Sequence, residues 1–168
     1  GMYVQGENPA MSDPNLNHAR SALAMLDHLV VQDIFLTETA NYADVILPAS
    51  AFAEKNGTVT NTNRQVQMGR KAVPPPGEAK EDWWIEVQLA KRMGLAWSYE
   101  SPSDVFAEMK LNMRSLDNIT WERLKNENAV TYPSLSEDDP GQSIVFGNGF
   151  PRQNGRARFT PASIIAPD

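Results

Sequence analysis

The chain has 168 residues, 41% of them hydrophobic, which is typical of one globular domain with its own core. A net charge of −6 argues against a nucleic-acid-binding surface, because neutralising phosphates requires a basic face. The absence of cysteine excludes disulfides, thiolate nucleophiles and iron–sulfur ligation by this chain. No apolar run could span a bilayer and no signal-peptide pattern precedes the first strand, so we expect a cytoplasmic protein without membrane or nucleic-acid partners.

The first half of the chain predicts alternating strands and helices. Short apolar strands are expected at residues 3–5, 29–31 and 44–48, and the last is stopped by a proline. A helix is expected after Ser12 or Asp13 as its cap, and one or two helical turns at 37–43. This alternation predicts an α/β fold with three αβα layers and a mainly parallel, Rossmann-like sheet.

The second half predicts helices followed by irregular chain. Extended chain is expected at 66–73, and helices are expected at 79–93, from a capping box at Ser101 to about Met113, and at 120–125. Beyond Asn128, prolines and glycines predict irregular chain with short strands near 144–146 and 157–159. We therefore divide the chain into an α/β segment (1–98), additional helices (99–128) and an irregular C-terminal extension leading to a missing domain (129–168).

Three polar clusters follow the predicted strands. They are Gly6-Glu7-Asn8, Gln32-Asp33, and the run from Ser50 into EKNGTVTNTNR. Because parallel sheets bind ligands beyond the carboxyl ends of their strands, these clusters predict a ligand site.

The side-chain chemistry of these clusters suits a nucleotide. Lys55 and Arg64 suit phosphate oxygens, whereas the Asp33 carboxylate suits donors such as ribose hydroxyls or a guanine edge. Asn8 and Gln32 can each donate and accept, as the edge of a heterocycle requires. For each residue alone, a structural role in a turn or an edge strand is favoured over ligand contact, and the convergence of several strand ends leaves the two alternatives equally open. Neither a GxGxxG nor a P-loop motif is present.

Several motifs in fixed order carry a resemblance to a known family. They are GENP at 6–9, VVQDIFLTETA at 30–40, YADVILP at 42–48, EKNGT through NR at 54–64, PGEA at 76–79 with DW at 82–83, and GRARF at 155–159. The series resembles an internal segment of the molybdopterin oxidoreductases, and it is most similar to the catalytic alpha subunits of formate dehydrogenases. The likeness is most specific over residues 2–94.

The resemblance implies a molybdopterin guanine dinucleotide cofactor carrying molybdenum or tungsten. Carried onto matching positions, it points to Asn8, Gln32, Asp33, Lys55 and Asp82 as dinucleotide contacts, with Thr37 and Arg64 as weaker candidates. Asp82 also has a structural interpretation, since an acid in the first turn of a helix stabilises the helix dipole by about 0.3–1 kcal/mol.

The resemblance also implies that this chain is a piece of a larger enzyme. The family's cysteine cluster, metal-ligating cysteine or selenocysteine and last domain have no counterpart here. We therefore expect the piece to be inactive alone and to retain no cofactor, with the remaining domains of the subunit and electron-transfer subunits as partners. The alternatives are a nitrate reductase-like fragment and a free-standing nucleotide-binding or protein-docking module.

Overall fold

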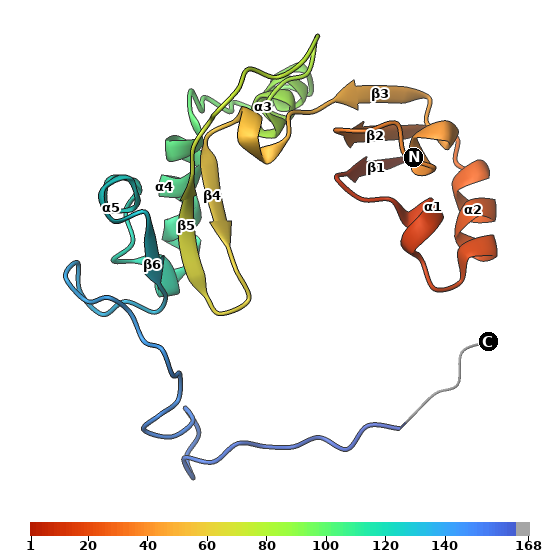
Figure 1. Cartoon of the computed structure of the whole chain (residues 1–168). Coiled ribbons are helices and arrows are strands. Elements are labelled where there is room, and N and C mark those ends of the chain that lie inside the picture. Colours follow the sequence, from red (N-terminus) through yellow and green to blue (C-terminus); the bar gives the residue numbers. More distant parts are fainter. Residues whose placement is uncertain (164–168) are drawn as a thin grey trace.

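The structure of the protein is a computed structural model, and residues 1–163 of it are described. Two three-stranded sheets, each packed with helices, lie side by side and are joined through η2 and α3 (Figure 1). The first group of elements is β1 (Met2–Gln5), α1 (Pro9–Ser12), α2 (Leu16–Ala24), β2 (Leu29–Asp33), the 3-10 turn η1 (Thr39–Tyr42) and β3 (Val45–Pro48). The second is η2 (Phe52–Glu54), β4 (Gly57–Thr60), β5 (Gln65–Gly69), α3 (Asp82–Arg92), α4 (Pro102–Asn112), η3 (Arg114–Leu116), α5 (Trp121–Glu127) and β6 (Ala129–Thr131).

The first sheet is parallel, with the order β1-β2-β3. Successive side chains of a strand point to opposite faces, so the register places Val4 and Val31 together on one face. On that face they pack with Ala10 of α1 and Leu23 of α2 in a buried core. The α/β class with a parallel sheet, predicted from the sequence, is confirmed.

The opposite face of this sheet receives α3 at the carboxyl ends of the strands. Gln5 Nε2 of β1 donates to Glu86 Oε1 at 2.7 Å, and Gln32 Nε2 of β2 donates to Asp82 Oδ1 at 2.7 Å. Both acceptors lie on α3, so helices approach the parallel sheet from both of its faces. The helix α3 begins three residues later than predicted, at Asp82.

The predicted helix cap at Ser12 or Asp13 is wrong. Ser12 ends the short helix α1, and Asp13 is extended, with φ −69° and ψ 133°. The following proline disfavours helical backbone at Asp13, which explains the break. Asn15 is the cap of α2 instead, and its Oδ1 accepts from the backbone N–H of His18 at 3.4 Å.

The second sheet is antiparallel, with the order β4-β5-β6. Its core consists of Val66, Phe106, Leu116, Ile119, Leu124 and Val130. These residues come from all three of the predicted segments, so buried contacts cross the boundaries expected at 98 and 128. This sheet was not predicted from the sequence, because β6 has only three residues and lies where irregular chain was expected.

The chain after β6 is irregular. Its first part, to about residue 143, is held against the second group by hydrogen bonds from Arg64 and Arg123, and the chain beyond it leads away (Figure 1). The short strands predicted near 144–146 and 157–159 are absent from this described part of the chain. Phe146 instead has a left-handed φ of 59° and stacks on Phe150 with ring centroids 5.0 Å apart. Among residues 1–163, no helix is long and apolar enough to cross a membrane.

Candidate functional site

A cleft of about 590 Å³ opens at the carboxyl ends of the parallel strands. It is lined by the end of β1, the end of β2 with its following loop, the segment after β3, one residue of β4 and the start of α3. The lining residues are Gln5, Gly6, Gln32, Asp33, Ile34, Phe35, Ala49, Ser50, Ala51, Phe52, Lys55, Val59 and Asp82. Gly6 has a φ of +60°, a conformation that glycine adopts readily, so the chain can turn directly after β1.

Four polar side chains form one hydrogen-bonded network along this cleft. The Tyr3 hydroxyl donates to Gln32 Oε1, and Gln32 Nε2 donates to Asp82 Oδ1 at 2.7 Å. Asp82 Oδ2 in turn accepts from the Lys55 ammonium, in an ion pair whose side chains are 28% and 25% exposed. The network connects β1, β2, α3 and the segment before β4, which are far apart in the sequence.

The network determines the ionisation of Asp82. Burial alone raises the pKa of this carboxyl, but hydrogen bonds from Lys55 and Gln32 and the charge of Lys55 outweigh burial and leave the pKa lowered. Burial, followed by the charges of Glu86 and Asp82, raises the pKa of the Tyr3 hydroxyl. Near neutral pH the site therefore contains an ionised Asp82 and a neutral Tyr3.

Lys55 and Asp33 retain hydrogen-bonding capacity toward the cleft. The Lys55 ammonium has three N–H donors, of which one is given to Asp82 and one to the backbone carbonyl of Ser50 at 2.9 Å. Asp33 Oδ1 accepts from the Phe35 N–H at 3.1 Å, and within residues 1–163 no partner is recorded for Asp33 Oδ2. One donor and one carboxylate oxygen thus remain for a ligand.

Asn8 and Thr37 belong to a separate cluster, outside the residues that line the cleft. Asn8 Oδ1 accepts from the backbone N–H of Thr39 at 3.1 Å and from its hydroxyl at 2.8 Å, while Asn8 Nδ2 donates to Glu38 Oε2 at 2.6 Å. The Asn8 hydrogen bond lowers the pKa of the Glu38 carboxyl. Thr37 Oγ1 accepts from the Ala40 N–H at 3.3 Å. In this structure both side chains shape the turn around η1.

Arg64 is not brought to the cleft. It lies in the turn between β4 and β5 with a left-handed φ of 69°. Its guanidinium donates to the backbone carbonyls of Tyr132, Gln142 at 2.9 Å and Ser143 at 3.0 Å. Arg64 therefore ties the start of the C-terminal extension to the second sheet.

The polar run EKNGTVTNTNR divides between two places. Lys55 and Val59 line the cleft, but the amides of Asn56 and Asn61 accept from backbone N–H groups of Lys71 at 3.0 Å and Gln65 at 2.8 Å. Most of the run therefore builds the β4–β5 hairpin rather than a ligand surface.

Two residues of this region were not predicted as site residues. Tyr3 was not singled out at all, and Ser50 was named only as the start of a polar run. The register pairs Tyr3 with Val30 and Gln5 with Gln32, which puts Tyr3 on the face of Gln32, but pairing is not visible in a single sequence. Ser50 is 1% exposed, and its Oγ is buried without a hydrogen-bond partner in the described chain. A partnerless buried hydroxyl is uncommon in folded proteins, so Ser50 marks this wall of the cleft as incomplete without a ligand or water.

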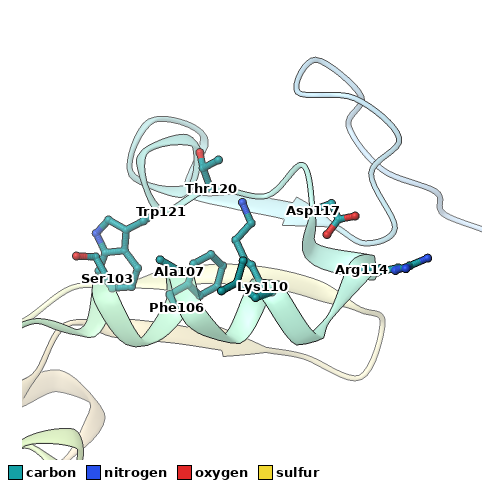
Figure 2. Close-up of a pocket in the computed structure, with 9 residues that line it drawn as sticks. Ser103, Phe106, Ala107, Lys110, Arg114, Asp117, Thr120 and Trp121 are labelled. Atoms are coloured by element: carbon teal, nitrogen blue, oxygen red, sulfur yellow. The ribbon is translucent and has the colours of Figure 1, made fainter. Parts of the chain in front are cut away.

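A second cavity, of about 570 Å³, lies on the other sheet's helices and holds none of the predicted site residues. Figure 2 shows Lys110 of α4 extending toward Thr120 at the start of α5, with Arg114 pointing outward at the end of the cavity. Phe106 and Trp121 meet edge to face on its wall, with centroids 6.0 Å apart.

Comparison with known proteins identifies the family. The family model for molybdopterin oxidoreductases matches residues 1–92. The chain belongs to the molybdopterin oxidoreductase family. Among solved structures, the acetylene hydratase of Pelobacter acetylenicus resembles this chain with a TM-score of 0.62 and 25% identity, over 77% of this chain and 18% of that one.

Curated relatives extend the similarity to nearly the whole chain. An F420-dependent formate dehydrogenase alpha subunit of Methanocaldococcus jannaschii is 48% identical over 95% of this chain and 24% of its own length. A putative formate dehydrogenase of Bacillus subtilis is 43% identical over 99% of this chain and 17% of its own length. The chain thus spans a quarter or less of these relatives. The predicted likeness to formate dehydrogenase alpha subunits is confirmed.

Proposed function

We propose that this chain is a cofactor-binding α/β segment of a molybdopterin-dependent formate dehydrogenase. In this proposal, the cleft at the strand ends receives part of a molybdopterin guanine dinucleotide. The observation that carries it is the convergence of Gln32, Asp33, Lys55 and Asp82 on one cleft. The identities of the relatives favour formate over nitrate as the substrate of the whole enzyme.

The unused polar groups of the cleft fit a nucleotide. The third Lys55 donor suits a phosphate or carbonyl oxygen, and the free Asp33 oxygen suits N–H or hydroxyl donors. The partnerless Ser50 hydroxyl adds one more group that can donate or accept. Lys55 balances Asp82, so the uncompensated charge among these residues is that of Asp33, which favours the nucleoside end of the ligand over its phosphates.

Within this proposal, some of the cleft residues contact the ligand and others hold those residues in place. Gln32 is fully buried, and both ends of its amide are already engaged by Tyr3 and Asp82. We therefore assign direct contact to Asp33 and Lys55, and a supporting role to Gln32 and Asp82. Asn8 and Thr37 reach the ligand only if it extends toward the η1 turn, and Arg64 takes no part.

The bound cofactor supplies the two-electron chemistry at its metal, while this chain binds and orients the cofactor. The rest of the catalytic subunit is the proposed partner at the cleft. Exposed apolar side chains border its opening, with Ile34 49%, Phe35 72% and Phe52 83% exposed. Apolar groups gathered around a polar cleft are typical of a surface that another part of the enzyme covers.

Nucleotide titration of the 168-residue chain, followed by backbone amide NMR shifts, tests this proposal. We expect GDP to bind with about millimolar affinity, because part of the cleft is missing. The shifts should concentrate at Gly6, Asp33 and Ser50 and exceed those caused by ADP. The variant Asp33→Asn should weaken the response, whereas Asp138→Asn, an exposed acid in the extension, serves as the matched control.

Two outcomes would overturn the proposal. One is that GDP shifts no amide of the cleft at several millimolar. The other is that its shifts cluster instead at Lys110 and Trp121 in the second cavity. A chain that binds GDP and ADP equally at the cleft would favour the general nucleotide-binding module.

A further inference from the structure

The network along the cleft begins at Tyr3, a residue that does not itself line the cleft. We propose that Tyr3 is a positioning residue, which acts through the Gln32 amide to orient Asp82 and thereby holds the Lys55 ammonium at the cleft wall. This inference rests on the proposed function, because it assigns Lys55 a ligand to meet.

The first step is the orientation of the Gln32 amide. An amide side chain can lie in two orientations that exchange its oxygen and nitrogen. The ionised Asp82 carboxylate only accepts, so the amide nitrogen faces it and donates at 2.7 Å, while the Tyr3 hydroxyl donates to Oε1 and holds the other end of the amide in place. In the reversed orientation, the amide oxygen would face the carboxylate, and two acceptors would repel each other.

The second step connects Asp82 to Lys55. Asp82 uses Oδ1 for Gln32 and Oδ2 for Lys55, so turning the carboxylate to recover one hydrogen bond displaces the other. Lys55 has a flexible four-carbon side chain, and its position is fixed by Asp82 together with the Ser50 carbonyl at 2.9 Å. If the Asp82 carboxylate is no longer held in place, the Lys55 ammonium keeps a single fixed acceptor, the Ser50 carbonyl. The direction of its third N–H donor then varies.

Burial and the neighbouring charges determine which groups can hold the Gln32 amide in place. Gln32 is fully buried, and within residues 1–163 the recorded donor to its Oε1 is the Tyr3 hydroxyl, although the Tyr3 side chain is itself 40% exposed. Within residues 1–163, the charges that act on Tyr3 and Asp82 include those of Lys55 and Glu86, and Glu86 accepts from the Gln5 amide at 2.7 Å; Asp33 lines the same cleft. The Tyr3 hydroxyl thus holds the oxygen end of the amide in place without adding a charge near neutral pH.

The variant Tyr3→Phe tests the inference, because it removes one hydroxyl and keeps the ring. Tyr42→Phe is the matched control: Tyr42 lies in the same unit and has no side-chain hydrogen bond recorded within residues 1–163. We expect Tyr3→Phe to raise the pKa of the Asp82 carboxyl in a carbon-13 NMR titration and to weaken GDP binding about two- to fivefold. Tyr42→Phe should change neither.

A double-mutant cycle identifies the route. Tyr3 and Asp82 have no recorded hydrogen bond to each other, and the Tyr3 hydroxyl is neutral at the acidic pH where Asp82 titrates, so the hydrogen-bonded route between them passes through Gln32. Replacing Gln32 by Met keeps a side chain of similar length and removes both of its hydrogen bonds. In the Gln32→Met background, Tyr3→Phe should have no further effect on the pKa of Asp82.

The outcomes separate this inference from the proposed function. An unchanged Asp82 pKa in Tyr3→Phe overturns the inference whatever happens to GDP, as does a Tyr3→Phe effect that persists in the Gln32→Met background. A raised Asp82 pKa in a chain that never binds GDP supports the positioning of Lys55 but refutes the nucleotide as its ligand.

Discussion

Replacing Asp82 by Asn tests whether the ion pair at the cleft stabilises the fold. The change keeps the side-chain shape and removes the charge that compensates Lys55. An Asn amide can still accept from Gln32, but its N–H₂ group then faces the Lys55 ammonium as a second donor. The variant thus leaves a partly buried cation without its counter-ion.

The magnitude follows from the exposure of the pair. Hydrogen bonds to charged groups contribute about 1.5–3 kcal/mol, and breaking a fully buried ion pair costs about 3–5 kcal/mol. The Asp82 and Lys55 side chains are 25% and 28% exposed, so solvent screens part of this interaction. We expect the free energy of unfolding to fall by about 1–3 kcal/mol. With a urea m-value of about 2 kcal/mol/M, the midpoint then moves down by about 0.5–1.5 M.

Urea denaturation followed by circular dichroism at several pH values provides the assay. The folded-state pKa of Asp82 is lowered, so its contribution is complete above the unfolded-state pKa of about 3.9 and is lost as pH falls through the lower folded-state pKa. The difference between wild type and Asp82→Asn should therefore be constant near neutral pH and shrink in acid. Equal midpoints at pH 7, or a difference that persists in strong acid, would refute the reasoning. The exposed Asp138→Asn is again the control.

Three further variants probe the second sheet and the extension. Arg123→Ala removes a buried guanidinium that donates to Ser134 Oγ and three backbone carbonyls. Thermal unfolding should show that the free energy of unfolding falls by about 3 kcal/mol, and an unchanged melting temperature would show that these hydrogen bonds do not stabilise the fold. Leu124→Ala empties a fully buried core position and should lower the free energy of unfolding in urea by about 2–5 kcal/mol; a loss below 1 kcal/mol would place Leu124 outside the core. Arg64→Lys keeps the charge but loses the planar fork, so limited proteolysis within the extension, beyond Pro133, should accelerate, and unchanged cleavage would show that Arg64 does not hold the extension.

Local patterns explain most of what could be predicted. The apolar runs of β2 and β3 and the proline that ends β3 were visible as short-range features. The capping box of α4 was also visible, and in the structure the Asp104 carboxylate accepts from the backbone N–H groups of Glu100 and Ser101, each at 2.9 Å. Each of these features depends on residues within a few positions of one another, so the sequence alone specifies them.

The second sheet illustrates the opposite case. Strand β6 has three residues, a length that carries no periodic signal, and it is a strand only because Val130 pairs with Val66. The three segments predicted for this chain were defined by changes in local pattern. A core drawn from residues 66 to 130 is set by distant contacts, which local pattern does not report.

The candidate site divides in the same way. Chemistry and strand ends were enough to select Gln32, Asp33 and Lys55, because parallel strands direct their carboxyl ends to one edge. The same reasoning also selected Arg64, whose guanidinium could bind a phosphate. In the structure, this group donates instead to backbone carbonyls of the extension. A guanidinium suits phosphates and backbone carbonyls alike, so residue type alone does not decide between them.

The sequence by itself determined the family, the α/β alternation and the kinds of polar groups at the strand ends, because these depend on local order and residue chemistry. Only the tertiary structure decided which groups face one another: strand register put Tyr3 beside Gln32, and the packing of α3 brought Asp82 to Lys55. Hydrogen bonds require atoms within about 3 Å, and across 27 to 50 residues of chain that proximity comes from folding alone.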